Sequence, residues 1–130
     1  MWLLSLSLSL SLRTVRDHDY QTFPVYNLAL QFISLMKVVI QELPRRSGLA
    51  DQLNRAAISI PLNIAEGSGE FSKREKARFY RIARRSALEC ASILDICDTL
   101  QLGDQTSVNQ GRAQLKLIVA MLTGLARRFA

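Results

Sequence analysis

Four stretches of this chain place apolar residues at every third or fourth position, and this repeat constrains the fold more than any other feature. The spacing is that of one face of an α-helix, and it predicts helices over residues 24–43, 49–66, 73–102 and 107–129. The breaks between them are only about 4–6 residues long, so successive helices must run antiparallel. We therefore expect an all-α protein, an antiparallel up-down-up-down four-helix bundle.

Local signals mark the ends of these helices. Pro24 suits a first helical position, and Gly67-Ser68-Gly69 should end the second helix. Ser72 followed by Glu75 reads as a capping box at the start of the third helix. Pro61 lies inside the second helix, where the missing backbone N–H predicts a kink rather than an end.

The apolar stripes predict which residues form the core. In the first two helices these are Val25, Leu28, Phe32, Leu35, Met36, Val39 and Leu43, then Leu49, Leu53, Ala56, Ile60 and Ile64. In the third helix they are Phe79, Ile82, Ala83, Ser86, Cys90, Ile93, Leu94, Cys97 and Leu100. In the fourth they are Leu115, Ile118, Leu122, Leu125 and Phe129.

Residues 1–19 differ from the rest, because leucine and serine alternate over most of their first half. The segment is too short to span a bilayer and has no basic residue before its apolar run. A strand or a signal segment is compatible with this pattern, but we interpret it as a disordered extension or a start placed too far upstream. The bundle domain should then occupy residues 20–130. No other stretch is apolar enough for a membrane helix, since Gln31, Ser34 and Lys37 interrupt the best candidate.

The chain of 130 residues has room for one domain, and its 48% apolar and 22% charged residues argue against wholesale disorder. The net charge is +6, carried mostly by arginine, whose planar guanidinium matches phosphate and carboxylate groups. This charge allows an anionic partner such as RNA or DNA, although basic character for solubility alone explains it equally well.

Cys90 and Cys97 are the two cysteines, and they share one face of one predicted helix, where they cannot reach each other. We therefore expect buried free thiols, which suit the reducing cytoplasm. His18 is the single histidine and lies outside the predicted bundle. The sequence thus predicts no metal site, no cofactor and no catalytic residue, and a hydrolase using Glu66 and Arg55 is a remote alternative.

Basic residues gather on one side of the first half of the third helix. Arg74, Arg78, Arg81 and Arg85 fall in a narrow arc opposite the predicted core, and Lys73 and Arg84 flank that arc. The second half of the helix is acidic instead. Such a row could follow a nucleic-acid backbone, but it could also pair with acids of a neighbouring helix or subunit, or simply be solvated. Arg127 and Arg128 suit the helix dipole at the C-terminus and need no further explanation.

The second helix is apolar on two sides. Ile58, Leu62 and Ala65 form a strip apart from the core stripe, and a strip of this kind at a surface predicts packing against another chain. We therefore expect a homo-oligomer. A polar strip lies beside it and reads as a structural network, made of Arg55, Ser59, Asn63 and Glu66.

Residues 55–67 read RAAISIPLNIAEG, and this segment resembles the hallmark helix of the four-helix-bundle proteins of 23S rRNA intervening sequences. The stretch over residues 77–87 is similar to the next motif of that family, except at Arg85, where the family often has glycine. The matching motif positions are Arg55, Pro61, Asn63, Glu66 and Gly67, then Arg78, Phe79, Ala83, Arg84 and Ser86. The resemblance implies a bundle that assembles into a ring, commonly a pentamer. It also implies kinship with the basic, nucleic-acid-binding accessory proteins of diversity-generating retroelements.

Overall fold

The computed structural model describes residues 23–130, and within them it contains four long helices and no strand. The predicted extension over residues 1–19, the first residues of the expected domain and His18 lie outside this described part. The helices are α3 (Phe23–Gln41), α4 (Leu49–Gly69), α5 (Lys73–Leu100) and α6 (Gln105–Phe129), and a short 3-10 turn, η1 (Arg45–Ser47), precedes α4.

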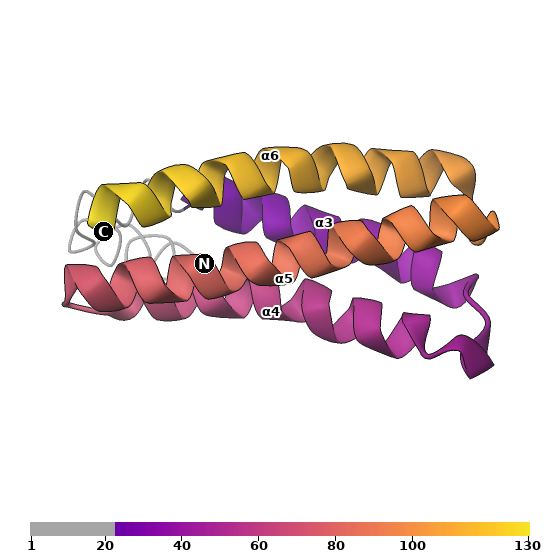
Figure 1. Ribbon diagram of the computed structural model, residues 1–130, viewed down its shortest axis with the longest axis horizontal. Coiled ribbons are helices and arrows are strands. Elements are labelled where there is room, and N and C mark those ends of the chain that lie inside the picture. Colours follow the sequence, from indigo (N-terminus) through magenta and orange to yellow (C-terminus); the bar gives the residue numbers. More distant parts are fainter. Residues whose placement is uncertain (1–22) are drawn as a thin grey trace, which may run out of the picture.

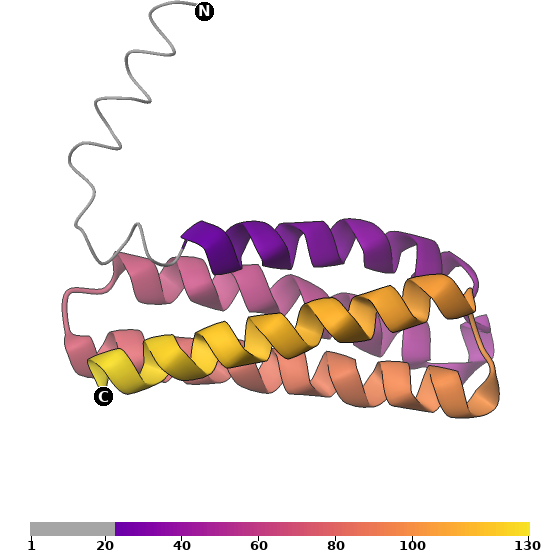
Figure 2. The same ribbon diagram turned by 90° about the horizontal axis from the view of Figure 1, so that it is seen from above.

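Each helix runs opposite to the one before it along the long axis of the molecule (Figure 1). Helices that are adjacent in the sequence pack side by side, and α3 also packs along α6, so the four helices surround one core. Figure 2 shows the same arrangement from above. The all-α, four-helix bundle predicted from the sequence is thereby confirmed.

Side-chain caps and left-handed residues fix where the helices begin and end. The Ser72 hydroxyl accepts a hydrogen bond from the backbone N–H of Glu75 at 3.3 Å, which confirms the predicted cap of α5. Asp104 caps α6 by accepting the backbone N–H of Ser107 at 3.0 Å. Gly48 separates η1 from α4 at a φ of 73°, a conformation that glycine adopts without a steric cost.

The helix α4 departs from its prediction at its end. It continues through Pro61 as one element and ends at Gly69, within the predicted Gly67-Ser68-Gly69 ending, so it is three residues longer than the predicted range. Gly67 is inside the helix and buried, because α5 packs against it. The predicted kink at Pro61 stays a prediction.

The core is built mostly as the apolar stripes predict. All five residues predicted for α6 are buried, and so are Phe32, Met36, Leu53 and Ile60 in the first two helices. Leu28, Leu35 and Leu49 are only half-buried at the edge of the core.

The core face of α5 is rotated from the predicted one. Phe79, Ile82 and Ser86 are half-buried, and Leu100 is exposed. The buried positions that the sequence missed are Lys76, Ala77, Tyr80 and Ala87. The physical reason is that α5 packs between α4 and α6. Its buried side therefore faces both neighbours instead of α4 alone.

This rotation predicts that two adjacent aromatic residues contribute unequally to the stability of the protein. Tyr80 is fully buried and its ring centroid lies 5.9 Å from that of Phe129, so Tyr80→Ala should lower the free energy of unfolding by about 3–5 kcal/mol. Phe79→Ala should cost about half of that or less, because this side chain is only partly buried. Urea unfolding of both variants measures the difference, and an equal or larger loss for Phe79→Ala would contradict this core.

Candidate nucleic-acid interface

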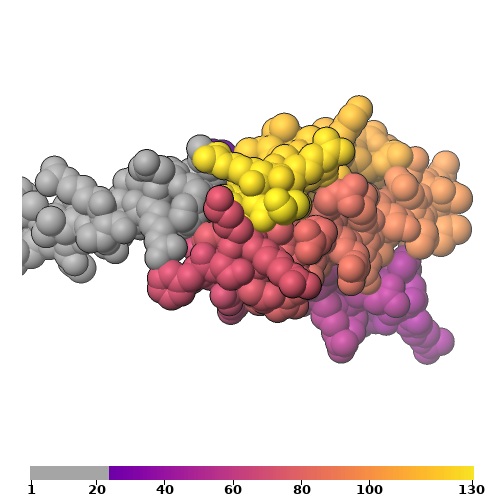
Figure 3. Space-filling model, turned by 60° about the vertical axis from the view of Figure 1, so that its left-hand side comes forward, coloured from indigo at the N-terminus to yellow at the C-terminus, as the bar shows by residue number. Residues whose placement is uncertain are grey.

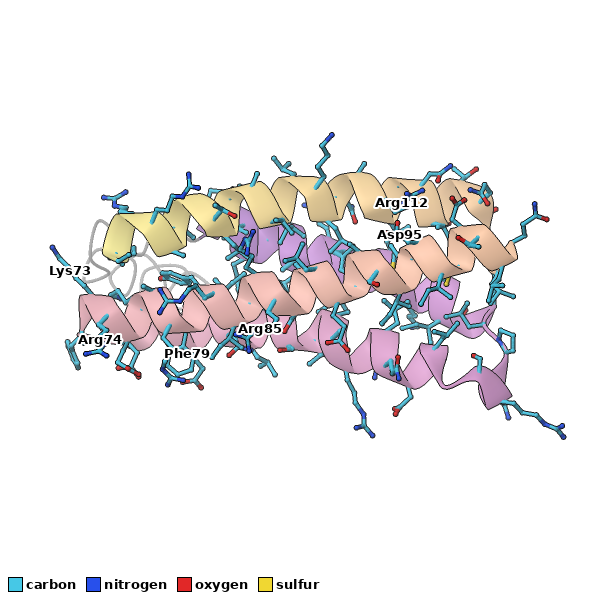
Figure 4. All side chains as sticks on the ribbon, in the orientation of Figure 1. Lys73, Arg74, Phe79, Arg85, Asp95 and Arg112 are labelled. Atoms are coloured by element: carbon cyan, nitrogen blue, oxygen red, sulfur yellow. The ribbon has the colours of Figure 1, made fainter. Side chains whose placement is uncertain are left out.

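The arginine row of α5 lies on the outer surface of the bundle. Arg74, Arg78, Arg81 and Arg85 are all exposed, as is Lys73, whereas Arg84 is half-buried. Figure 4 shows Lys73 and Arg74 at the end of the bundle where α5 begins, and Arg85 farther along the same helix. At a rise of 1.5 Å per residue the row is about 16 Å long, which is enough to contact successive phosphates of one strand.

Most of these guanidinium groups have no acidic partner among residues 23–130. Arg78 forms an ion pair at 3.1 Å with Glu75 on the same helix, and its guanidinium lies 4.6 Å from the ring centroid of Phe79. Among residues 23–130, Arg74, Arg81 and Arg85 form no ion pair. Pairing with acids of a neighbouring helix, one of the alternatives weighed above, therefore does not account for these three.

Arg84 links the arginine row of α5 to α6 through a hydrogen bond. Its Nε donates a hydrogen bond to Thr123 Oγ1 on α6 at 2.8 Å, and the same hydroxyl donates to the Val119 carbonyl at 2.8 Å. The guanidinium is thus held at the seam between α5 and α6, so basic side chains of both helices face one surface.

Arg127 of α6 joins that surface, although its position in the sequence assigned it no role there. Arg127 lies one helical turn beyond Thr123, and Arg128 follows it. Both are exposed, at the end of α6 that lies beside the first turns of α5 (Figure 3). This proximity could have been predicted from the antiparallel topology, because that topology places the C-terminus of α6 next to the N-terminus of α5. We call the combined surface the basic face: Lys73, Arg74, Arg78, Arg81, Arg84, Arg85 and Arg127.

Two acids in the second half of α5 are paired with α6. Arg112 of α6 contacts Asp95 at 3.0 Å and Asp98 at 3.3 Å, toward the opposite end of the bundle (Figure 4). Gln105 also donates a hydrogen bond to Asp98 at 2.6 Å. Asp95 and Asp98 therefore have partners, whereas within residues 23–130 most arginines of α5 outside this end form no ion pair.

In the polar strip of α4, the two middle residues form hydrogen bonds that reach α5, whereas the residues at its two ends are exposed. The hydroxyls of Ser59 and Ser86 lie 2.8 Å apart, and the Asn63 amide donates to both the hydroxyl and the carbonyl of Ser59. These contacts join α4 to α5. Arg55 and Glu66 are exposed, and Arg55 pairs with Asp51 at 3.1 Å, so these two do not belong to the bonded centre.

The buried Lys76 links the end of α4 to α5 by hydrogen bonds, and the sequence pattern did not predict its burial. Lys76 is 1% exposed, and its Nζ donates hydrogen bonds to the carbonyls of Gly67 at 3.2 Å and Ser68 at 2.9 Å. These are helix-terminal carbonyls, which a cation satisfies well. Lysine inside an apolar pattern reads as a surface residue, so periodicity alone conceals this role.

The remaining predicted residues are placed as follows. Ile58, Leu62 and Ala65 are exposed on the outer side of α4, and Pro61 is buried. Cys90 and Cys97 are buried free thiols, as predicted. Residues 23–130 bring no three potential metal ligands together, and they include no helix long and apolar enough to cross a membrane.

Burial changes the acidity of both thiols. Desolvation, with a smaller contribution from the neighbouring Glu89 carboxylate, raises the pKa of Cys90 from 9.0 to about 12. Desolvation also raises the pKa of Cys97. Both thiols are therefore protonated in the native protein at neutral pH and are weak nucleophiles.

Comparison with known families agrees with this geometry. The family model described as 23S rRNA-intervening sequence protein matches residues 21–124, which include α4, α5 and most of α6. A comparison with curated proteins found no match to the chain.

The close contact at Gly67 predicts that replacing Gly67 and replacing Gly69 with alanine affect the stability of the protein differently. A Cβ at Gly67 would lie 2.7 Å from Tyr80 Cε1, whereas a Cβ at Gly69 would meet no atom within 4 Å. Gly67→Ala should therefore lower the free energy of unfolding by about 1–3 kcal/mol. Gly69→Ala should leave it unchanged or raise it by about 0.5–1 kcal/mol. Thermal unfolding of the two variants tests this prediction. Equal unfolding temperatures would show that α4 and α5 are farther apart at Gly67 than described.

The thiol of Cys90 predicts a loss of stability at alkaline pH. Below pH 9 the thiol is protonated in both states and contributes nothing to the pH dependence. Above pH 9 the unfolded chain releases this proton while the native protein retains it up to about pH 12, so the free energy of unfolding falls. The fall is about 1.4 kcal/mol per pH unit for one thiol.

Cys90→Ala provides the control for this titration, because every other group is unchanged. The stability of the original protein relative to the variant should decrease between pH 9 and pH 11, measured by urea unfolding at each pH. A difference that stays constant over this range would mean that the thiol is not desolvated.

Proposed function

The chain belongs to the 23S rRNA-intervening sequence protein family, and on that premise we propose that it is a homo-oligomeric bundle that binds nucleic acid through backbone phosphates. The observation that carries the proposal is the basic face, whose arginines Arg74, Arg81 and Arg85 have no acidic partner in the described part of the chain. The ring, commonly a pentamer, implied by the family resemblance is part of the proposal.

The position of the charges supports a functional rather than a stabilising role. Lys73 and Arg74 stand in the first turn of α5, where the helix dipole is positive and basic residues are unfavourable. Glu75 is the one acid of that turn. Residues that oppose the local preference of a helix are expected where binding requires them.

The kind of contact follows from the side chains present. Arginine donates two parallel hydrogen bonds to a phosphate, and a row of such groups gives binding that depends on salt and not on sequence. Phe79 is half-buried and covered by the Arg78 guanidinium, so it is not arranged to stack on a base. We therefore expect contacts to the backbone of RNA or DNA.

We also infer that the chain is not an enzyme and that it acts in the cytoplasm. The support is chemical: no histidine lies in residues 23–130, and both thiols there are buried and protonated. Buried free thiols are typical of a reducing compartment.

Charge reversal on the basic face tests the proposal. Arg74→Glu combined with Arg81→Glu should weaken RNA and DNA binding at low salt by about tenfold or more. It should also reduce the slope of log affinity against log salt by about two, one for each lost phosphate contact. Filter binding over a salt series measures both quantities.

The matched control reverses two arginines at the other end of the bundle. Arg45 and Arg46 in η1 are exposed, so Arg45→Glu with Arg46→Glu changes the net charge equally without touching the basic face. Binding should be nearly unchanged in this control. Equal loss in both pairs would indicate an effect of net charge alone, and no binding by the original protein at any salt would refute the proposal.

The second candidate function is a protein scaffold whose arginines bridge subunits, with no role in nucleic-acid binding. The lack of partners for Arg74, Arg81 and Arg85 favours it equally, since acids of another subunit could supply them. In that case Arg74→Glu with Arg81→Glu lowers the mass of the assembly in light scattering, whereas phosphate binding leaves the mass unchanged.

A further inference from the structure

The outer side of α3 is unusually poor in charge for a surface helix. Lys37 is the single charged residue among its 19 residues. Leu30 and Val38 are 43% and 44% exposed, and the other exposed positions of the helix carry neutral side chains. A solvated helix normally places charged residues on its outer side. This helix therefore presents a surface suited to burial.

The apolar strip of α4 lies next to that surface. Ser59 and Asn63 occupy the seam with α5, so Ile58, Leu62 and Ala65 lie away from α5, on the outer side of α4. A cleft of about 370 Å³ between α3 and α4 is lined by residues of both helices: Ile33, Met36, Lys37, Ile40 and Gln41 from α3, and Asn54 and Ala57 from α4.

These cleft residues set the register of the two antiparallel helices. Lys37 lies level with residues near Asn54, so Leu30 lies level with Leu62, about two turns along each helix. The exposed leucine of α3 and the apolar strip of α4 therefore form one continuous surface. We call it the α3–α4 face: Leu30, Ile33, Ile58, Leu62 and Ala65.

The outer sides of α3 and α4 together supply a large part of the area of a stable contact. With 19 residues α3 is about 28 Å long, and packed helices lie about 8–10 Å apart. Two such helices present a flat area on the order of 500 Å², which uneven side chains enlarge. A standard protein interface covers about 800 Å² on each partner.

Charge indicates what covers the surface. The chain has a net charge of +6, and two copies that met through the basic face would oppose like charges, which is repulsive. The α3–α4 face contains no charged residue, Lys37 lies at its edge, and the nearby Arg55 is already paired with Asp51. We infer that the α3–α4 face is where a second copy of this chain docks.

This inference rests on the proposed function only in taking the chain to be an oligomer, and it names the surface that assembles. In the bundle, α3 and α4 lie on the side opposite α5 and α6. A second copy on the α3–α4 face thus leaves the basic face of both copies accessible to an anionic partner.

The test compares two pairs of leucines with matched exposure. Leu30→Glu with Leu62→Glu places charge on the α3–α4 face, at positions that are 43% and 59% exposed. Leu88→Glu with Leu100→Glu is the control on α5, at positions that are 43% and 60% exposed. Light scattering after gel filtration should show at least a twofold lower mass for the first pair and the original mass for the control.

Each other outcome overturns the inference. An unchanged mass for the first pair, a lower mass for the control, or a monomeric original protein would each show that self-association does not use this face. Circular dichroism checks that the variants are folded. If the glutamate pair unfolds, Leu30→Gln with Leu62→Gln provides the same comparison with a milder change.

Nucleic-acid binding is measured separately on the same proteins. The masses are determined without RNA, so an original protein that binds no RNA contradicts the proposed function and leaves the α3–α4 face standing. The first leucine pair keeps every arginine of the basic face and should still retain RNA at low salt. If the first leucine pair has a smaller mass but still binds RNA, self-association and nucleic-acid binding use different surfaces of the protein.

Discussion

The close approach of α4 to the first turns of α5 determines the orientation of everything on the outer side of α5. Gly67 has no side chain, so the ring of Tyr80 packs against its backbone, and Lys76 bonds the last carbonyls of α4 from the same side. These contacts turn Tyr80 and Lys76 inward. Because residues on opposite sides of a helix move together, the same contacts turn the arginine row outward.

The sequence predicts most of the fold because helical periodicity is a direct consequence of burying one face. The four helical segments and the buried stripe of α6 follow from that constraint, and the cap at Ser72 follows from a separate local signal, the capping box with Glu75. The rotation of α5 could not be predicted in this way. Phe79 is more hydrophobic than Lys76, and periodicity assumes that the more hydrophobic residue is buried. The structure reverses this order, because the terminal carbonyls of α4 supply acceptors for the lysine ammonium group.

The candidate interface was predictable to the extent that it lies on one helix. Four arginines within one arc remain exposed even though the core face is rotated, since the arc lies on the far side of α5 from both the predicted and the observed core residues. The contributions of α6 depend on which helices are neighbours, and no pattern within α6 reveals that Thr123 holds Arg84. Likewise, the α3–α4 face joins residues that are distant in the sequence, so it becomes visible only when α3 and α4 are placed side by side.

The ion pairs between Arg112 and the acids of α5 have an effect that extends beyond that end of the molecule. Arg112 offsets one of the two aspartate charges at that end, while the other half of the described bundle carries an excess of positive charge. The protein therefore has a large electric dipole moment along its length. In the field of a distant polyanion such a molecule rotates before contact, so its encounters would be oriented, and added salt would slow them by shortening the range of that torque.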